Sequence, residues 1–406
     1  MGAFRRQQLK LLGSLTVSLT ILAFCAQKQT GRYSLLTSWD VVQCVLTNGQ
    51  GSGYDGGIMT VATANHIQNT IALYYGAWQG GQSRTGTIAA AFGPAWDSIN
   101  KHGIVLSKST SGWDSGYVSG PRLYQESGTN YLFYFGGQGA AFEEFPSRIG
   151  VAISTDGTNF TKYAGNPLLN LGSDGSFDDT TLYTFNVVKR ENLYYAFYNA
   201  YNGSMLESIG FAMATNVLGP WVKYSGNPVV INPGPPNDFN VAADANVFPL
   251  DEGGWGMIFR TYVGATTPGK STLASAFSSD LTNWTAIATM FWQNSIDPGP
   301  SELYGTWLFQ DNGPMLLADD LSHIYRLRPT FSNLFDLAHP AWLPDGTFQC
   351  LFVGATGLNY RVEASTNLLP NSWITLTNFL HATPTRVIRD PSPASQAKRF
   401  YRAATP

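Results

Sequence analysis

The sequence has little charge and few cysteines for its 406 residues. Charged residues make up 13% of it, the net charge is −3, and no Lys/Arg cluster beyond the first ten residues could neutralise a row of phosphates. We therefore expect no nucleic-acid partner. The sequence also lacks a nucleophile elbow, a Ser/His/Asp spacing, a CxxC pair and a Gly-rich phosphate loop followed by a helix. It offers no motif for a serine nucleophile, thiol redox chemistry or nucleotide binding.

The N-terminus is typical of an export signal. Three basic residues within the first ten precede an apolar run over residues 11–26, which is short for a membrane span and is followed by polar residues. We expect residues 1–26 to be a cleaved signal peptide and the protein to be secreted, extracellular or periplasmic, without stable membrane insertion. Surface attachment through a lipidated Cys25 is the alternative, but the bulky Phe24 before it favours an ordinary signal peptide.

The exported chain keeps two cysteines, Cys44 and Cys350. An oxidising compartment permits a disulfide between them, which would join the N-terminal strand to the C-terminal region. Two buried free thiols are the alternative, and the sequence does not decide between them.

Aromatic residues and glycine are abundant. The chain holds 20 Tyr, 24 Phe, 11 Trp and 42 Gly, a composition that favours short strands and tight turns over helices. We therefore predict an all-β protein.

Two sequence features repeat about every 60 residues. The phrase Ser154–Phe160 returns as Ser278–Trp284, with looser copies elsewhere, and its aromatic residue recurs every 61 to 64 residues, at Trp96, Phe160, Trp221 and Trp284. An aspartate recurs every 59 to 64 residues, at Asp55, Asp114, Asp178, Asp238 and Asp297. Five structural units are therefore predicted.

Each unit contains a short apolar strand rich in aromatic residues. These strands are predicted at Thr70–Gly76, Tyr131–Gly137, Tyr194–Ala200, Trp255–Tyr262 and Met315–Asp319. A further β-type run precedes each of them, and a third run and the repeat phrase follow, which makes four strands per unit. The fifth unit lacks its closing phrase, but Ser38–Asp40 supplies one. We predict a five-bladed β-propeller over residues 30–330, closed by an N-terminal strand.

The last part of the chain, residues 338–406, departs from this repeat. Strands are predicted at Tyr360–Ser365, Trp373–Thr377 and Arg399–Ala403, which makes a small C-terminal β module. The segment resembles C-terminal modules of secreted environmental bacterial proteins. Carbohydrate binding, surface attachment and structural capping remain open for it.

The repeated phrases resemble a known group of enzymes. Trp113–Pro121, Tyr131–Gly137, Ile149–Gly157 and Gly165–Pro167 are similar to blades of five-bladed propeller glycoside hydrolases, and Gly226–Pro228 repeats one phrase in the next blade. The group includes the arabinanase/xylosidase, fructan hydrolase and mannoside phosphorylase families. The resemblance implies a propeller fold and a carbohydrate substrate.

Glycosidic bond cleavage usually needs two carboxyl groups, one as an acid and one as a base or nucleophile. In a propeller, the first strand of each blade lines the axial channel, so acids near its start converge on one funnel. The candidates are Asp55, Asp114, Asp178, Asp179, Asp238, Asp244, Asp297 and Glu302.

The resemblance implies a role for some of these acids. The arabinanase/xylosidase pattern matches Asp55 as the base and Asp114 as the orienting acid, but no Glu stands at the start of the third blade. Asp178 and Asp179 stand there instead. Asp244 lies close to where fructan hydrolases place their acid.

A structural role for the recurring aspartates is the competing interpretation. Chemistry is needed once, whereas an acid that recurs in every blade is more economically a residue that binds turn amides. The acids that occur in one blade alone, Asp179, Asp244 and Glu302, are therefore the sharper catalytic candidates. Asp156 and Asp280, within the repeat phrase, are predicted to form turns.

Other side chains are candidates for substrate binding. Arg260 interrupts an apolar strand and could bind a sugar or form a structural ion pair. Trp78, Trp113 and Tyr117 could stack on sugar rings or pack between blades. Glu143 and Glu144 could reach over the pocket or remain solvated. A single His323 near the axis is insufficient for a metal site, so no metal and no cofactor are predicted.

These observations favour a secreted glycoside hydrolase that acts on plant or algal oligosaccharide or polysaccharide through carboxylates in the funnel. A non-catalytic carbohydrate-binding propeller and a polysaccharide lyase are the alternatives, because the usual acid of the third blade is missing.

Overall fold

The computed structural model describes most of the chain beyond residue 38. The described residues are 39–49, 53–80, 85–140, 144–203, 207–230, 241–250, 254–263, 270–289, 292–310, 314–329, 335–343, 347–354, 359–367, 369, 372–380, 385–390 and 399–404. The predicted signal peptide and Cys25 lie outside them. In the part of the chain that is described, no helix is long and apolar enough to cross a membrane.

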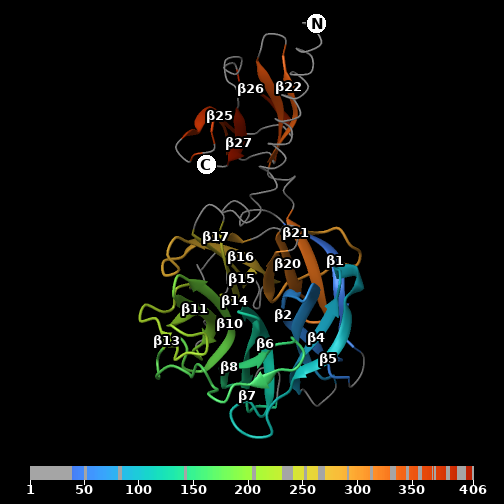
Figure 1. The fold of residues 1–406 in the computed structure, drawn as a ribbon, viewed down its shortest axis with the longest axis vertical. Helices are drawn as coiled ribbons and strands as arrows, with labels where there is room; N and C mark the ends of the chain where they lie inside the picture. The colour runs from blue at the N-terminus through green and yellow to red at the C-terminus, as the bar shows by residue number, and fades with distance from the viewer. Residues whose placement is uncertain are drawn as a thin grey trace. The chain divides into compact units, whose positions relative to one another are not determined.

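The chain divides into two compact units. The larger unit is Trp39–Arg328, and the other contains Pro329–Pro406. Each is built from small, mainly antiparallel β-sheets (Figure 1), so the predicted all-β class is confirmed.

The larger unit contains four sheets of four strands, in sequence order, within its described residues. The first sheet contains β2 (Ile58–Ile67), β3 (Thr70–Trp78), β4 (Gly86–Gly93) and β5 (Asn100–Leu106), with the short 3-10 helix η2 (Trp96–Ser98) before β5. The second contains β6 (Tyr117–Glu126), β7 (Thr129–Gly137), β8 (Ser147–Ser154) and β9 (Thr161–Lys162). The third contains β10 (Thr181–Arg190), β11 (Leu193–Tyr201), β12 (Glu207–Ala214) and β13 (Val222–Lys223). The fourth contains β14 (Ala243–Pro249), β15 (Trp255–Val263), β16 (Lys270–Ser278) and β17 (Thr285–Thr289).

The fifth sheet joins the two ends of the larger unit. Its strand order is β18 (Trp292–Asn294), β1 (Trp39–Thr47), β21 (His323–Pro329), β20 (Pro314–Asp319) and β19 (Thr306–Gln310). The N-terminal strand β1 therefore lies in the same sheet as the last strands of the unit, as its closing phrase predicted. The five predicted aromatic strands correspond to the second strands β3, β7, β11, β15 and β20.

Hydrogen bonds join each sheet to the next and the fifth sheet to the first. They run from Leu123 N–H to Thr63 Oγ1 (3.2 Å), between the hydroxyls of Ser147 and Thr181 (2.6 Å), from Val247 N–H to Asn186 Oδ1 (2.8 Å), from Leu308 N–H to Asn246 Oδ1 (2.7 Å), and from the Trp307 indole to Ala64 O (2.7 Å). Alternating apolar side chains fill the space between the sheets, which is why these short strands are stable only together.

The repeat phrase forms a tight turn after the third strand. The Asp156 carboxylate accepts hydrogen bonds from the backbone N–H groups of Thr158 and Asn159, both at 2.8 Å, and Asp280 does the same in the fourth sheet. These amides hold the pKa of both carboxyls far below its usual range. The predicted turn role of both residues is confirmed.

The recurring aspartates of the first three sheets occupy one repeated environment. Asp114 is buried before β6, where it forms an ion pair with Lys162 (2.6 Å) of β9 and accepts a hydrogen bond from Tyr134 (3.1 Å) of β7. Asp178 pairs in the same way with Lys223 and Tyr198. Asp55 pairs with Lys101 and lies beside Tyr75. Each aspartate thus ties the entrance of a sheet to its second and fourth strands.

The unit that contains the C-terminus has two three-stranded sheets. One holds β22 (Phe335–Trp342), β23 (Phe348–Gly354) and β26 (Thr385–Asp390), and the other β25 (Ile374–Leu380), β24 (Asn359–Ser365) and β27 (Phe400–Ala404). A small aromatic core joins them, in which Phe348 stacks on Tyr401 at 4.1 Å between ring centroids. Cys350 is buried in this core, Cys44 is exposed on β1, and neither forms a disulfide.

The repeated aspartate environment leads to a prediction about stability. Asp114→Asn removes a buried carboxylate from Lys162 and Tyr134, so the free energy of unfolding should fall by about 1.5–3 kcal/mol. Urea unfolding of the larger unit, followed by tryptophan fluorescence, measures this loss. Asp174→Asn, at an exposed position, is the matched control and should change stability little. Equal effects of the two substitutions would contradict a structural role for Asp114.

Candidate functional site

The first strands of four sheets share a bulge near their starts. The strand register shifts between Thr60 and Thr63 in β2, between Ser119 and Arg122 in β6, between Tyr183 and Asn186 in β10, and between Ala243 and Asn246 in β14. The first extra residue has a positive φ in three of them, at Gly120 (59°), Thr184 (35°) and Asp244 (54°). A bulge redirects a side chain, and a left-handed backbone is strained for residues other than glycine. The bulge therefore has a different residue, with different chemistry, at this position in each sheet.

At the bulge of β14, the Asp244 carboxylate points toward β15, the second strand of its own sheet. It is 7% exposed, and its Oδ2 accepts a hydrogen bond from Arg260 Nε at 2.9 Å. Its backbone N–H donates to Asn199 Oδ1 of the third sheet at 3.2 Å. The structure therefore brings together two predicted site residues, Asp244 and Arg260.

Glu207, which sequence reasoning missed, begins the third strand of the third sheet. Ser147 and Ser271 hold the matching position in the second and fourth sheets, where their hydroxyls donate to the carbonyls of Leu182 in β10 and of Leu303, which precedes β19. Glu207 makes that connection with its backbone instead, because its carbonyl accepts the N–H of Ala242 at 2.8 Å. Its side chain is thus not needed to join the sheets.

Four residues form what we call the Arg260 cluster: Asn199, Glu207, Asp244 and Arg260. Arg260 Nη2 donates to Glu207 Oε2 at 3.3 Å, while its Nε binds Asp244. The Asn199 amide donates to Glu207 Oε1, and Asn199 Oδ1 accepts the Thr184 hydroxyl at 2.6 Å. One guanidinium and one oriented amide therefore hold two carboxylates from adjacent sheets.

Burial sets the proton affinity of this cluster. Loss of hydration raises the pKa of Glu207 above its ordinary value of 4.5, and the negative charge of Asp244 raises it further, while Arg260 opposes both. Burial alone would lower the pKa of Arg260, but Glu207 and Asp244 raise it by more, so the guanidinium stays charged. Glu207 is thus a carboxyl that retains its proton at a higher pH than an exposed glutamate.

Arg122 supports the cluster from the second sheet. Its side chain is fully buried, with guanidinium nitrogens 3.4 Å from Ala62 O and 3.5 Å from Asp244 O. It lies over the ring of Trp307 at 5.8 Å, which provides cation–π attraction. Burial lowers its pKa to about 10, against the opposing charges of Asp244 and Asp319. This buried cation contacts the carbonyl of the left-handed residue Asp244.

Glu302 is linked to the surroundings of Arg260 through Tyr304. It accepts hydrogen bonds from Tyr304 (2.9 Å) and from the backbone N–H of Ser271 (3.3 Å). Tyr304 interacts electrostatically with Tyr262 and Arg260, and Arg260 Nη1 donates to the Tyr262 hydroxyl at 3.1 Å. Glu302 therefore lies next to the Arg260 cluster without contacting its carboxylates.

The remaining predicted acids lie elsewhere. Asp179 accepts the N–H of Gly175 (2.8 Å) and the hydroxyl of Thr180 (2.9 Å), as a turn residue does. Asp297 is exposed, and Asp238 and Glu143 lie outside the described residues. Glu144 is exposed and accepts the N–H of Ala140.

His323 binds Asp320 at 3.1 Å. Among the described residues no three His, Cys, Asp or Glu side chains gather as metal ligands.

The predicted aromatic platforms belong to the core. Trp78 and Tyr117 are 1% and 0% exposed and pack against each other at 5.2 Å between ring centroids. Trp113 stacks on Tyr134 at 5.7 Å. Neither Trp78 nor Tyr117 presents a ring face to solvent, which favours packing between sheets over stacking on a sugar.

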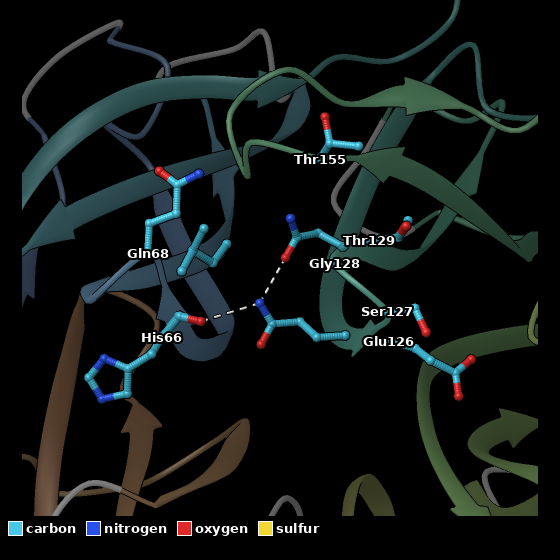
Figure 2. Close-up of a pocket in the computed structure, with 10 residues that line it drawn as sticks. His66, Gln68, Glu126, Ser127, Gly128, Thr129 and Thr155 are labelled. Atoms are coloured by element: carbon cyan, nitrogen blue, oxygen red, sulfur yellow. Dashed lines mark hydrogen bonds between the residues drawn. The ribbon is translucent and has the colours of Figure 1, made fainter.

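A pocket of about 350 Å³ lies at the other ends of the first strands (Figure 2). It is lined by the β2–β3 and β6–β7 turns, with His66, Gln68, Glu126 and Thr155 among its residues. The Gln125 amide bridges His66 O (3.3 Å) and Asn130 Oδ1 (2.8 Å). Ten-residue strands separate these turns by about 30 Å from the strand starts that carry the predicted acids. This pocket is therefore separate from the Arg260 cluster.

Comparison with known proteins bears on the fold. No protein-family model and no curated protein matches the sequence. Among solved structures, BT0996 in its RGII complex has a TM-score of 0.59 at 17% identity, and the match covers 73% of this protein and 94% of BT0996.

A family 117 glycoside hydrolase, Zg3597 from Zobellia galactanivorans, has a TM-score of 0.55 at 14% identity, and the match covers 72% of this protein and 90% of Zg3597. The α-L-arabinofuranosidase PaAbf62A from Podospora anserina has a TM-score of 0.52 at 10% identity, with 73% and 98% covered. These identities show the fold alone: the chain shares the architecture of propeller-type glycoside hydrolases, the group that its repeated phrases resemble.

Proposed function

We propose that the larger unit is a five-bladed β-propeller, closed by β1, that hydrolyses O-glycosidic bonds. The observation that supports this most directly is a pair of carboxyls, the buried Asp244 and the largely buried Glu207 (13% exposed), bound by one guanidinium. They occur in one sheet each, whereas Asp55, Asp114 and Asp178 repeat with lysine partners and fit a structural role. Two carboxyls with different environments are the chemical requirement for glycoside hydrolysis.

The environments assign one role to each carboxyl. Glu207, whose raised pKa favours the protonated form, donates a proton to the leaving glycosidic oxygen. Its Oε2, held by Arg260 at the longer distance of 3.3 Å, is the oxygen best able to exchange that contact for a proton. Asp244, bound by Arg260 Nε at 2.9 Å, activates water or attacks the anomeric carbon.

The substrate proposed is a plant or algal oligosaccharide or polysaccharide, and the protein is proposed to be exported by residues 1–26 as an extracellular or periplasmic enzyme. The solved relatives that are named as glycoside hydrolases support the reaction class. Residues 338–406 are proposed as a separate C-terminal β module. The proposed reaction needs no cofactor, because both proton transfers use side chains of the Arg260 cluster.

Substitution of either carboxyl tests the proposal. Glu207→Gln and Asp244→Asn should each lower kcat by about 10²–10⁴-fold, because each removes a proton-transfer or nucleophilic group while keeping the shape of the side chain. Hydrolysis is measured on polysaccharides and aryl glycosides that the wild type cleaves, with circular dichroism to confirm folding.

Glu126→Gln is the matched control, since Glu126 is also a hydrogen-bonded carboxylate but lies at the β6–β7 turn, and it should keep full activity. Folded Glu207→Gln and Asp244→Asn proteins with wild-type rates would refute the assignment. Glycan affinity without detectable hydrolysis by the wild type would favour the non-catalytic alternative, and unsaturated products would identify a lyase.

The pH dependence of hydrolysis gives a second prediction. The rate should fall as pH rises through the raised pKa of Glu207, since the general acid must keep its proton. Arg260 favours the ionised form, so Arg260→Gln should raise this pKa further and move the alkaline limb of the kcat/KM profile to higher pH, in addition to slowing the reaction. An alkaline limb that moves to lower pH would contradict the proposed role of Glu207.

A further inference from the structure

Two aromatic rings lie beside the proposed acid and have no part in the chemistry. Tyr201, the last residue of β11, is the direct cross-strand partner of Glu207, the first residue of β12. Its ring is 5.4 Å from that of Phe145 between centroids, with a tilt of 36° between the planes. Directly opposed residues of an antiparallel pair project to the same side of the sheet, so Tyr201 places this pair next to the Arg260 cluster.

Phe145 is unusual in its exposure. Its side chain is 49% exposed, and among the described residues it is the one exposed Phe, Tyr or Trp. The other large hydrophobic residues of the larger unit with comparable exposure are aliphatic. An exposed aromatic ring lacks the stabilisation that burial provides, so packing in the core does not explain why Phe145 stands at this position. A flat apolar face next to polar groups is the surface on which the C–H groups of a sugar ring stack.

Hydrogen bonds hold the segment that precedes Phe145. The buried Tyr117 donates its hydroxyl to the Glu144 carbonyl at 2.9 Å, and the Glu144 carboxylate accepts the Ala140 N–H at 2.8 Å. These bonds fix the backbone on the N-terminal side of Phe145. The backbone that carries the ring is therefore positioned before any ligand binds, which reduces the entropy cost of binding.

The charges near the pair favour an uncharged ligand. Glu207 and Asp244 both bind Arg260, the cation of the cluster. Glu144, which precedes Phe145 in the sequence, is an exposed third acid. A uronic acid or sulfated sugar would face these carboxyls with no unpaired cation of the cluster to receive it. Neutral sugars carry no such penalty.

We propose that Phe145 and Tyr201 form a binding subsite for a neutral sugar ring of the substrate, adjacent to the sugar whose bond is cleaved at Glu207. This subsite rests on the proposed function for its place in the substrate, but binding can be measured without hydrolysis. It makes the site prefer a chain of at least two neutral sugars over a single sugar.

The test measures binding by the Glu207→Gln variant, so that no substrate is consumed. Neutral oligosaccharides of arabinose, xylose and galactose are compared with oligogalacturonates by titration calorimetry. Adding Phe145→Ala to this variant should raise the Kd for the neutral oligosaccharide that binds best by about 5- to 10-fold, because one stacking contact is lost. Phe145→Trp should restore binding, and Ile104→Ala, which removes another exposed apolar side chain, should leave it unchanged.

The outcomes separate the subsite from the reaction. Unchanged binding in the Phe145→Ala variant, tighter binding of oligogalacturonate, or binding of none of the neutral oligosaccharides overturns the subsite. A loss of binding in Phe145→Ala, restored in Phe145→Trp, supports it even if the wild type hydrolyses none of the bound sugars. Binding without hydrolysis by the wild type would refute the proposed hydrolysis but not the subsite.

Discussion

The arrangement of the candidate site depends on how the fold keeps two carboxyls buried next to each other. Like charges in a site of low polarity cannot both ionise without a cation, and Arg260 supplies it from the second strand of the fourth sheet. Arg122 is buried, contacts the backbone carbonyl of Asp244 and adds positive charge from the second sheet. Three sheets must therefore meet in register before Glu207 acquires its raised pKa.

The chemistry of the larger unit lies in the positions at which its sheets differ. The lysine partners of Asp55, Asp114 and Asp178 repeat in three sheets, and the turns at Asp156 and Asp280 repeat in two, because similar sheets need similar connections. At the matching places of bulge and third strand, the second sheet has Gly120 and Ser147, while Asp244 and Glu207 stand in the fourth and third sheets. A function grafted on a repeat is expected at such exceptions.

The repeat made much of the fold predictable. The spacing of the aspartates and closing aromatics anticipated the strands, the turns and the place of β1 in the fifth sheet, because these depend on local pattern. The site was predictable in part: Asp244 and Arg260 were chosen because they break the pattern, but their contact was not foreseen. Glu207 was missed because catalytic acids were expected at the starts of first strands, although a Glu at a position held by serine in two other sheets was a usable signal. The contacts between side chains of different sheets depend on the positions of the bulges, and no short sequence pattern predicts those positions.

The reacting sugar is proposed to bind at the Arg260 cluster. The most direct test is a crystal structure of the Glu207→Gln variant with an oligosaccharide that it binds. We predict a glycosidic oxygen within hydrogen-bond distance of residue 207, the anomeric carbon facing Asp244, and the neighbouring ring stacked on Phe145. A sugar bound instead in the pocket between the β2–β3 and β6–β7 turns, with the Arg260 cluster unoccupied, would contradict this placement.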